Sequence, residues 1–421
     1  MTGIETITLP ESMVASDVME LFDALQAGGA SVRFVGGCVR DAILQRPIAD
    51  IDVATDAEPA RVREMLKGCH IKSVPTGVVH GTLTVVPQTR AFHVTTLRRD
   101  IKTDGRHATV AYTTDWAEDA RRRDFTINGM YLGRDGTLHD YVGGLADLHE
   151  GRVRFIGRPS DRIAEDYLRI LRFFRFHATY GKLEPDPEGV AACQEMALKA
   201  KNLSGERIWR ELSRTLRAPE PGPVFNVMED IGLLGVIFAT KASVPRLTSL
   251  SAVEKCVAST PDPIRRLSAL TLDNEAAVSK IAARLRLSGG ETARMRSLSA
   301  NQGQASAGMK QGPLSCLMYD LGTEVVCDLI LLEWADQITS DRTKQIDVED
   351  DWKTIWDIAS TWTRPRFPLN GADLLRAGIE EGPQIGIILS TIEKWWISAA
   401  FHPDREACLK KLCEFLQDLH P

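Results

Sequence analysis

The chain has 421 residues, of which 43% are hydrophobic and 26% are charged, and its formal net charge is -6 at pH 7. That length exceeds one ordinary hydrophobic core, so we expect a globular protein of several domains. The negative charge argues against a generic polyanion binder, because non-specific nucleic-acid affinity comes from neutralising phosphates. No apolar stretch reaches the roughly 18 residues typical of a membrane-spanning helix, so no membrane association is expected.

The eight cysteines are scattered, with no C-x-x-C pair and no zinc-like spacing to histidine. This pattern is typical of reduced thiols, so we expect a cytoplasmic protein. Charge is unevenly distributed, because residues 152–217 hold 14 Lys and Arg against 9 Asp and Glu, an excess of five positive charges. The segment offers a local basic surface, although arginines on a helix are also typical of an ordinary solvated face.

The first chemical motif follows a short strand predicted near the N-terminus. Residues 12–28 are expected to form a helix and residues 32–35 the strand. Gly36 and Gly37 then let the backbone approach a ligand closely, and the start of the next helix, which contains Arg40, presents N–H groups that attract anions. A Gly-Gly pair before a helix is often just a tight turn, so this motif alone does not define a phosphate site.

The second strand, residues 48–53, carries Asp50 and Asp52. Because side chains alternate along a strand, both carboxylates face one side while Ile51 and Val53 face the core. Two hard carboxylates on one face suit Mg²⁺. An Asp-x-Asp pair alone is usually a solvated strand end. Its adjacency to a glycine loop and an arginine predicts a metal-dependent phosphate site instead.

The rest of the first 150 residues is expected to complete a small mixed sheet with flanking helices. Residues 99–115 are charged and contain Asp104-Gly105, which predicts a mobile loop, and a helix is expected from about 116 to 132. The remaining elements are predicted as a helix at 58–67 and strands at 71–74, 81–87 and 91–97.

Within the helix predicted at 116–132, Arg123, Asp124 and Asn128 fall on roughly one side. They offer a cation for phosphate, an acceptor for ribose hydroxyls and an amide for either group. Arg123 closes a run of three arginines, so an ordinary basic surface explains the motif equally well. We treat these three residues as candidate nucleotide contacts.

Beyond Gly151 the pattern becomes almost wholly helical. The first long helix is expected to run from Ser160 or Asp161 to about His177, and helices of about ten to twenty residues continue to the C-terminus. Six tryptophans lie between residues 334 and 396. Their helical spacing favours a place in the core over a stacking platform for bases.

In the helix predicted from 160 to 177, Asp166, Arg169, Arg172 and Arg175 recur every three residues and form a polar stripe. An acid followed by a base three residues on is often just an intrahelical salt bridge. A carboxylate accepts and a guanidinium donates, however, so Asp166 and Arg169 together match a base edge with an amino donor beside a ring-nitrogen acceptor. Cytosine and adenine present that edge, whereas uracil and guanine would leave unpaired groups, which supports selection without a template.

Together these motifs resemble the class II tRNA nucleotidyltransferase and bacterial poly(A) polymerase family of the polymerase-beta-like nucleotidyltransferases. The resemblance covers about residues 31 to 217, and the ordered set of five motifs is highly specific. The matching pieces are GGCVRD with DID, HGTLTVV followed by VTTLRRD, RRRDFTINGMY, EDYLRILRFFRF and GERIWREL. The helical remainder of the chain resembles the family only in its helical character, without matching motifs.

The resemblance implies an α+β fold, with a small mixed β-sheet nucleotidyltransferase head followed by an elongated all-helical neck, body and tail. The head would span residues 1–150, the neck with the base-recognition helix 151–275, and the tRNA-binding body and tail 276–421. Asp50 and Asp52 would hold Mg²⁺ and carry the catalysis. The predicted nucleotide-binding residues are Gly36, Gly37, Arg40, Arg123, Asp124, Asn128, Asp166, Arg169, Arg172 and Arg175.

The expected reaction is template-independent addition of C, C and A to the 3′ end of tRNA from CTP and ATP. A poly(A) polymerase, or an enzyme adding CC alone or A alone, is the alternative that uses the same site. His93 stands where many members carry a third acidic residue. It is either a metal ligand of another kind or a sign of a different local arrangement, and it leaves an inactive RNA-binding scaffold as an alternative. The sequence leaves the oligomeric state open.

Overall fold

The computed structural model describes residues 5–77, 81–88, 90–104, 107–240, 242–271, 275–340 and 349–419. The chain divides into two compact units. Unit 1 is Met1–Ala218 with Pro223–Ala239, and unit 2 is Pro219–Gly222 with Thr240–Pro421. The functional division at residues 150 and 275 stays a prediction. No helix in the described ranges is long and apolar enough to cross a membrane.

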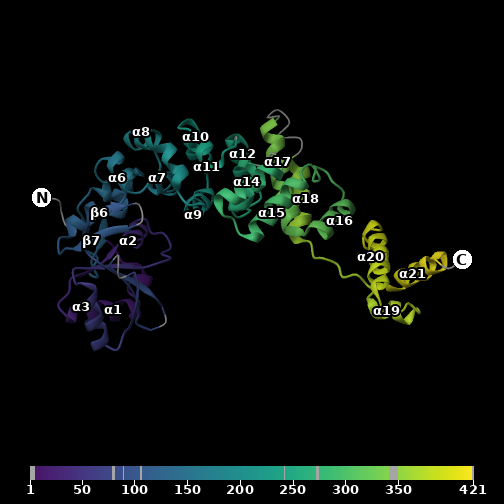
Figure 1. Ribbon diagram of the computed structural model, residues 1–421, viewed down its shortest axis with the longest axis horizontal. Coiled ribbons are helices and arrows are strands. Elements are labelled where there is room, and N and C mark those ends of the chain that lie inside the picture. Colours follow the sequence, from purple (N-terminus) through teal and green to yellow (C-terminus); the bar gives the residue numbers. More distant parts are fainter. Residues whose placement is uncertain are drawn as a thin grey trace. The chain divides into compact units, whose positions relative to one another are not determined.

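Unit 1 is drawn in purple to teal in Figure 1. It is built on a mixed seven-stranded sheet with the strand order β3-β4-β5-β2-β1-β8-β9. β2 and β5 pair in parallel, and the other neighbours pair antiparallel. The predicted small mixed sheet and the α+β class are therefore confirmed. The strands are β1 (Val32–Val35), β2 (Asp52–Thr55), β3 (Lys72–Gly77), β4 (Thr82–Val86), β5 (Phe92–Thr96), β8 (Met130–Leu132) and β9 (Leu138–Asp140).

Alternating side chains place a separate apolar cluster on each face of this sheet. On one face Phe22 of α1 (Ser16–Ala27) packs against Phe34, with ring centroids 4.6 Å apart. On the other face Val35 and Ala54 join Trp116 of α4 (Trp116–Arg121) in a buried cluster. Burial of both faces fixes the register, since a shift of one residue would exchange the two sets of side chains.

Two predictions for the middle of unit 1 are wrong. Residues 99–115 do not form a loop, because β6 (Arg98–Asp104) and β7 (His107–Tyr112) pair as an antiparallel ribbon. Gly105 lies outside the described residues. The helix predicted at 116–132 ends at Arg121, and a 3-10 helix, η3 (Thr126–Asn128), leads into β8. Residues 130–132 become a strand because they pair with both β1 and β9.

The helices after Gly151 follow the predicted change to helical structure, and the earlier ones flank the sheet. In chain order, the further elements are η1 (Glu11–Met13), α2 (Gly37–Ile43), α3 (Pro59–Gly68), α5 (Gly144–Glu150), α6 (Pro159–Glu165), α7 (Leu168–Tyr180), α8 (Pro187–Met196), η4 (Ala197–Asn202), α9 (Gly205–Leu216), α10 (Gly222–Asp230) and α11 (Leu233–Phe238).

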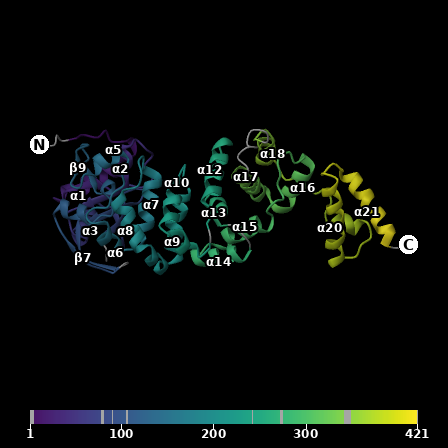
Figure 2. The same cartoon turned by 90° about the horizontal axis from the view of Figure 1, so that it is seen from above.

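The regular elements of unit 2 are all helices within its described residues, as the green and yellow ribbon of Figure 2 shows. The core is stabilised by buried ion pairs as well as apolar packing, since Arg265 contacts Glu254 at 2.7 Å and Asp328 at 3.1 Å with all three side chains buried. The helices are α12 (Val244–Cys256), α13 (Pro263–Thr271), α14 (Glu275–Leu285), α15 (Gly289–Ala300), α16 (Gln311–Leu321), α17 (Thr323–Ser340), α18 (Glu349–Thr361), α19 (Gly371–Arg376), α20 (Pro383–Ser398) and α21 (Arg405–Leu419).

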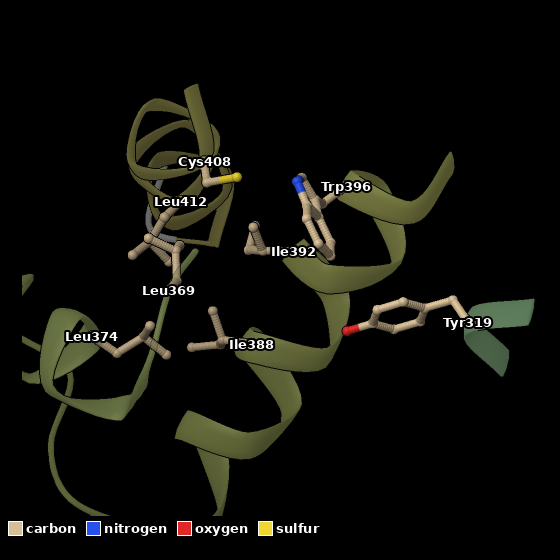
Figure 3. Packing of buried hydrophobic residues seen from close by; sticks show 8 residues of the cluster. All are labelled: Tyr319, Leu369, Leu374, Ile388, Ile392, Trp396, Cys408 and Leu412. Atoms are coloured by element: carbon tan, nitrogen blue, oxygen red, sulfur yellow. The ribbon is translucent and has the colours of Figure 1, made fainter. Parts of the chain in front are cut away.

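The last three helices share an apolar cluster, shown in Figure 3. Its buried members are Tyr319, Leu369, Leu374, Ile388, Ile392, Trp396, Cys408 and Leu412. Trp396 is buried there, and Trp334 and Trp352 are buried elsewhere in unit 2 with their rings stacked. For these three tryptophans the predicted place in the core is confirmed.

Candidate active site

A pocket of about 750 Å³ in unit 1 contains every nucleotide and metal ligand predicted from the sequence. Eight arginines and five aspartates are among its lining residues, an excess of three positive charges. Such a lining favours a polyanionic ligand. The lining residues are Gly36, Gly37, Arg40, Asp41, Ala49, Asp50, Asp52, Arg122, Arg123, Asp124, Asn128, Asp166, Leu168, Arg169, Arg172, Arg175, Phe176, Arg207 and Arg214.

The glycine loop between β1 and α2 lies beneath two guanidinium groups. Gly36 has a φ of 74°, a left-handed conformation that favours glycine. A Cβ at Gly36 would lie 3.8 Å from Nη1 of Arg123, and one at Gly37 would lie 3.6 Å from Nη2 of Arg40. The loop and the two arginines therefore form a cradle in which backbone N–H groups and cations converge, as a phosphate chain requires.

The paired carboxylates lie beside this cradle. Asp50 precedes β2, which begins at Asp52 rather than at residue 48, while Ile51 and Val53 are buried as predicted. Burial raises the pKa of Asp52, and the neighbouring Asp50 raises it further, against the lowering effects of His93 and Arg123. The charge of the carboxylate pair is thus incompletely compensated, and an oxygen-only donor set fits a hard divalent cation.

His93 lies next to Asp52 because the two residues pair in register across the parallel strands β2 and β5. Nδ1 of His93 is 3.9 Å from Oδ1 of Asp52, and both side chains are about half exposed. No cluster of three or more His, Cys, Asp or Glu side chains suited to a metal occurs in the described ranges. A cation held by Asp50 and Asp52 would therefore need further oxygen ligands from its substrate.

Arg123 is held in place by a carboxylate that sequence reasoning missed. Asp119 of α4 is fully buried and accepts bonds from Arg123 at 2.9 Å and from the Tyr131 hydroxyl at 2.6 Å. It also pairs with Arg122 at 2.7 Å. Burial raises the pKa of Asp119, but the charges of Arg123 and Arg122 outweigh burial and hold it well below its usual range.

We expect Asp119→Asn to lower the free energy of unfolding by about 3–5 kcal/mol, because it leaves two arginines beside a buried neutral group. Since the folded-state pKa is depressed, the carboxylate stabilises the protein fully above its unfolded-state pKa of about 4, and this contribution is lost as pH falls further. Urea denaturation at pH 7 and at pH 3 measures both effects. The difference between wild type and variant should shrink at pH 3, and equal midpoints at pH 7 would contradict the assignment.

Asp124 and Asn128 form a second network over the pocket floor. Asp124 accepts a bond from Nδ2 of Asn128 at 3.0 Å and from Nε of Arg172 at 2.9 Å. Asn128 in turn accepts from Arg40 at 2.6 Å. Burial raises the pKa of Asp124, but the Arg172 charge and these bonds hold it well below its usual range. Although these residues do not share the single helix that was predicted, the turn after α4 and the helix η3 bring them together.

The helix predicted from 160 to 177 is broken at Asp166. Asp166 has φ -156° and ψ 108°, an extended conformation between α6 and α7. Its Oδ1 accepts the backbone N–H of Leu168 at 3.1 Å, and its Oδ2 accepts from Arg207 of α9 at 2.6 Å. Arg169 donates to Glu165 and to the carbonyl of Arg162. Both members of the predicted base-reading pair still line the pocket.

The helix α9, which packs along α7, contributes further charged side chains to the site. Glu211 is buried and lies 2.6 Å from Nε of Arg175 and 3.8 Å from Nη1 of Arg172. Arg207 and Arg214, which were not predicted as site residues, line the pocket from the same helix. Arg207, Glu211 and Arg214 are spaced by four and three residues, so they lie on one face of the helix. This spacing could have been recognised from the sequence.

Comparison with known proteins agrees with this arrangement. A family model for the poly(A) polymerase head domain matches residues 32–154, and a model for the probable RNA and SrmB-binding site of polymerase A matches residues 182–245. The CCA tRNA nucleotidyltransferase 1, mitochondrial, of Danio rerio is 33% identical over 96% of this chain and 92% of its own length. The CCA-adding enzyme of Limosilactobacillus fermentum is 28% identical over 94% of this chain and 96% of its own length.

Solved structures share the fold. The crystal structure of the Bacillus stearothermophilus CCA-adding enzyme in complex with CTP has a TM-score of 0.70 at 21% identity, covering 96% of this chain and 99% of that one. The Thermotoga maritima CCA-adding enzyme complexed with tRNA has a TM-score of 0.63 at 19% identity, with coverage of 98% and 100%. The nucleotidyltransferases of this family generally use divalent metal ions. The chain belongs to the class II CCA-adding enzyme and poly(A) polymerase family, and within it to the CCA tRNA nucleotidyltransferases.

Proposed function

We propose that this protein adds C, C and A to the 3′ end of tRNA, using CTP and ATP and releasing pyrophosphate. The observation that carries the proposal is that Asp50 and Asp52 line the same pocket as Asp166 and Arg169. One nucleotide can thus have its phosphates at the carboxylate pair and its base at the acid–base pair. Near full-length similarity to CCA tRNA nucleotidyltransferases supports the same reaction.

Base selection follows from the polarity of Asp166 and Arg169. The carboxylate accepts the exocyclic amino group of cytosine or adenine, and the guanidinium donates to the adjacent ring nitrogen. Uracil and guanine would set an acceptor against an acceptor, which leaves buried polar groups unpaired. Each residue now bonds to a protein partner, Arg207 or Glu165, so an entering base replaces part of these contacts.

Asp50 and Asp52 would hold Mg²⁺ through their carboxylate oxygens, with phosphate oxygens completing the coordination. When bound, the cation supplies charge neutralisation at the phosphates and favours the deprotonated 3′-hydroxyl. The protein positions the triphosphate through the N–H groups after Gly36 and through Arg40 and Arg123. These groups stabilise the charge that moves toward the leaving pyrophosphate.

The transfer itself needs little further chemistry from the chain. The tRNA 3′-oxygen forms a bond to the α-phosphorus while the bond from the α-phosphorus to the oxygen that bridges to the β-phosphorus breaks. Pyrophosphate leaves with that oxygen, and the hydroxyl proton passes to water. Asp124 and Asn128 line the pocket and would accept from and donate to the ribose hydroxyls, replacing part of the hydrogen bond that they now share. Most of the catalysis then comes from positioning and electrostatic stabilisation.

The proposed site of action is the cytoplasm, because all eight cysteines are unpaired thiols. The compartments of the relatives differ, since the Danio rerio protein is described as mitochondrial. Fractionation of cells that produce the full chain, followed by detection of the protein, tests this proposal directly. Recovery with an organelle would contradict it.

Incubation of the protein with tRNA lacking its last three nucleotides tests the reaction. We expect two residues added with CTP alone, three with CTP and ATP together, and a complete loss of addition with excess EDTA. The added residues should be read by sequencing the 3′ ends. A ladder of A residues on unrelated RNA would favour a poly(A) polymerase, and addition of CC alone or A alone with both nucleotides present would indicate a specialised enzyme.

A further inference from the structure

Among the eight arginines that line the pocket, seven have a carboxylate partner and Arg214 has none within the described ranges. Arg214 is exposed on α9. The pairs are Arg40 with Asp41, Arg122 and Arg123 with Asp119, Arg169 with Glu165, Arg172 with Asp124, Arg175 with Glu211, and Arg207 with Asp166. Along α7 and α9, Arg214 is therefore the lining arginine that no carboxylate of the described residues pairs with.

The surroundings of Arg214 strengthen its attraction for an anion. Burial lowers the pKa of Arg175 to about 10, and the charges of Arg172 and Arg214 act in the same direction. The carboxylates beside these cations are already paired, Glu211 with Arg175 at 2.6 Å and Asp124 with Nε of Arg172 at 2.9 Å. An anion at Arg214 would relieve repulsion among guanidinium groups that the fold holds together.

Arg214 also lies away from the groups assigned to the base. Asp166, just before α7, pairs with Arg207 near the start of α9. Arg175 and Glu211 pair further along the two helices, and Arg214 follows Glu211 on α9. Seven residues separate Arg207 from Arg214, a rise of about 10 Å along the helix. Arg214 would therefore reach a different part of a bound substrate from the base-reading pair.

We propose that Arg214 binds a backbone phosphate of the tRNA 3′ strand, the strand whose terminal hydroxyl is extended. This inference rests on the proposed function. A phosphate of the incoming nucleotide has the same chemistry, but the glycine cradle already brings Arg40 and Arg123 to the triphosphate. An exposed cation suits a strand that enters from solvent, and Arg214 lies within the residues 182–245 that match the RNA-binding family model.

The test compares Arg214→Ala with Arg210→Ala, a variant of the same charge change on the same helix. Arg210 is exposed and does not line the pocket. Binding of a labelled tRNA that lacks CCA is measured by fluorescence anisotropy at several salt concentrations, and the KM for CTP is measured separately. Loss of a charged contact should weaken tRNA binding about tenfold in Arg214→Ala. The slope of log K against log salt should fall by about one.

Arg210→Ala should keep the wild-type tRNA affinity, and both variants should keep the wild-type KM for CTP. Arg214→Lys should recover part of the affinity and most of the salt slope, because the charge is restored. A raised KM for CTP in Arg214→Ala, with or without weaker tRNA binding, would assign the residue to the nucleotide and overturn the proposal. Unchanged tRNA binding would also overturn it. Failure of the wild-type protein to extend tRNA would instead contradict the proposed function.

Discussion

Asp50→Asn and Asp52→Asn should each reduce nucleotide incorporation by about 10³-fold or more while the protein stays folded. The amide keeps the shape of the carboxylate but removes the charge that would hold a divalent cation, so stabilisation worth several kcal/mol is lost at the reacting phosphate. Folding should be spared because Asp52 is about half exposed and Asp50 is exposed. Single-turnover incorporation of CMP from CTP into tRNA is the measurement.

Asp23→Asn is the matched control for these variants. Asp23 is an exposed carboxylate of α1 that does not line the pocket, so its loss should leave incorporation unchanged. Calorimetric titration with Mg²⁺ in the presence of CTP should show weaker binding in Asp50→Asn and Asp52→Asn than in the control. Incorporation at the wild-type rate in both site variants would show that the carboxylate pair does not serve the metal.

Asp166→Ala should relax the selection of CTP and ATP over UTP and GTP by about 10- to 100-fold. Removing the carboxylate deletes the acceptor that distinguishes an amino group from a carbonyl, and a charge-assisted hydrogen bond is worth about 1.5–3 kcal/mol. The ratio of kcat/KM for CTP to that for UTP on tRNA lacking CCA measures the effect. In Asp166→Ala we expect both a lower ratio and a lower rate of CTP incorporation.

A suitable control for this effect is Asp161→Ala in the preceding helix α6, where the carboxylate is exposed and outside the pocket. It should keep the wild-type ratio. Arg207→Lys preserves a cation beside Asp166 and should change the ratio less than Asp166→Ala does. Equal CTP-to-UTP ratios in Asp166→Ala and wild type would remove Asp166 from base selection.

The local motifs of the head could be predicted because short-range rules determine them. Alternation of side chains predicted that Asp50 and Asp52 face away from the core, and although Asp50 precedes β2, both line the pocket while Ile51 and Val53 are buried. The glycine loop before α2 was likewise recognisable from its sequence. These features depend on the chain within a few residues of each position.

Other elements depend on partners far along the chain. The apolar residues of β8 fit a helix or a strand equally well, and pairing with β1, nearly one hundred residues earlier, decides for the strand. The break at Asp166 results from competition, because its side chain bonds to the N–H of Leu168 and to Arg207 instead of allowing a continuous helix.

Asp119, Glu211 and Arg214 were missed by sequence reasoning for the same reason, because their roles depend on partners far along the chain. Asp119 could be counted as an acid three and four residues before two arginines, but its complete burial depends on the packing of α4 against Tyr131. Glu211 and Arg214 are brought to the pocket by the packing of α9 on α7, a contact between segments about forty residues apart. Charge patterns alone did not separate them from an ordinary solvated helix face.

The most direct test of the central claim is the structure of the protein with Mg²⁺ and a non-hydrolysable CTP analogue. We predict the triphosphate on the loop at Gly36 and Gly37 with the metal at Asp50 and Asp52, and the cytosine amino group on Asp166. A triphosphate bound away from these carboxylates, or a cytosine edge that contacts neither Asp166 nor Arg169, would contradict the account.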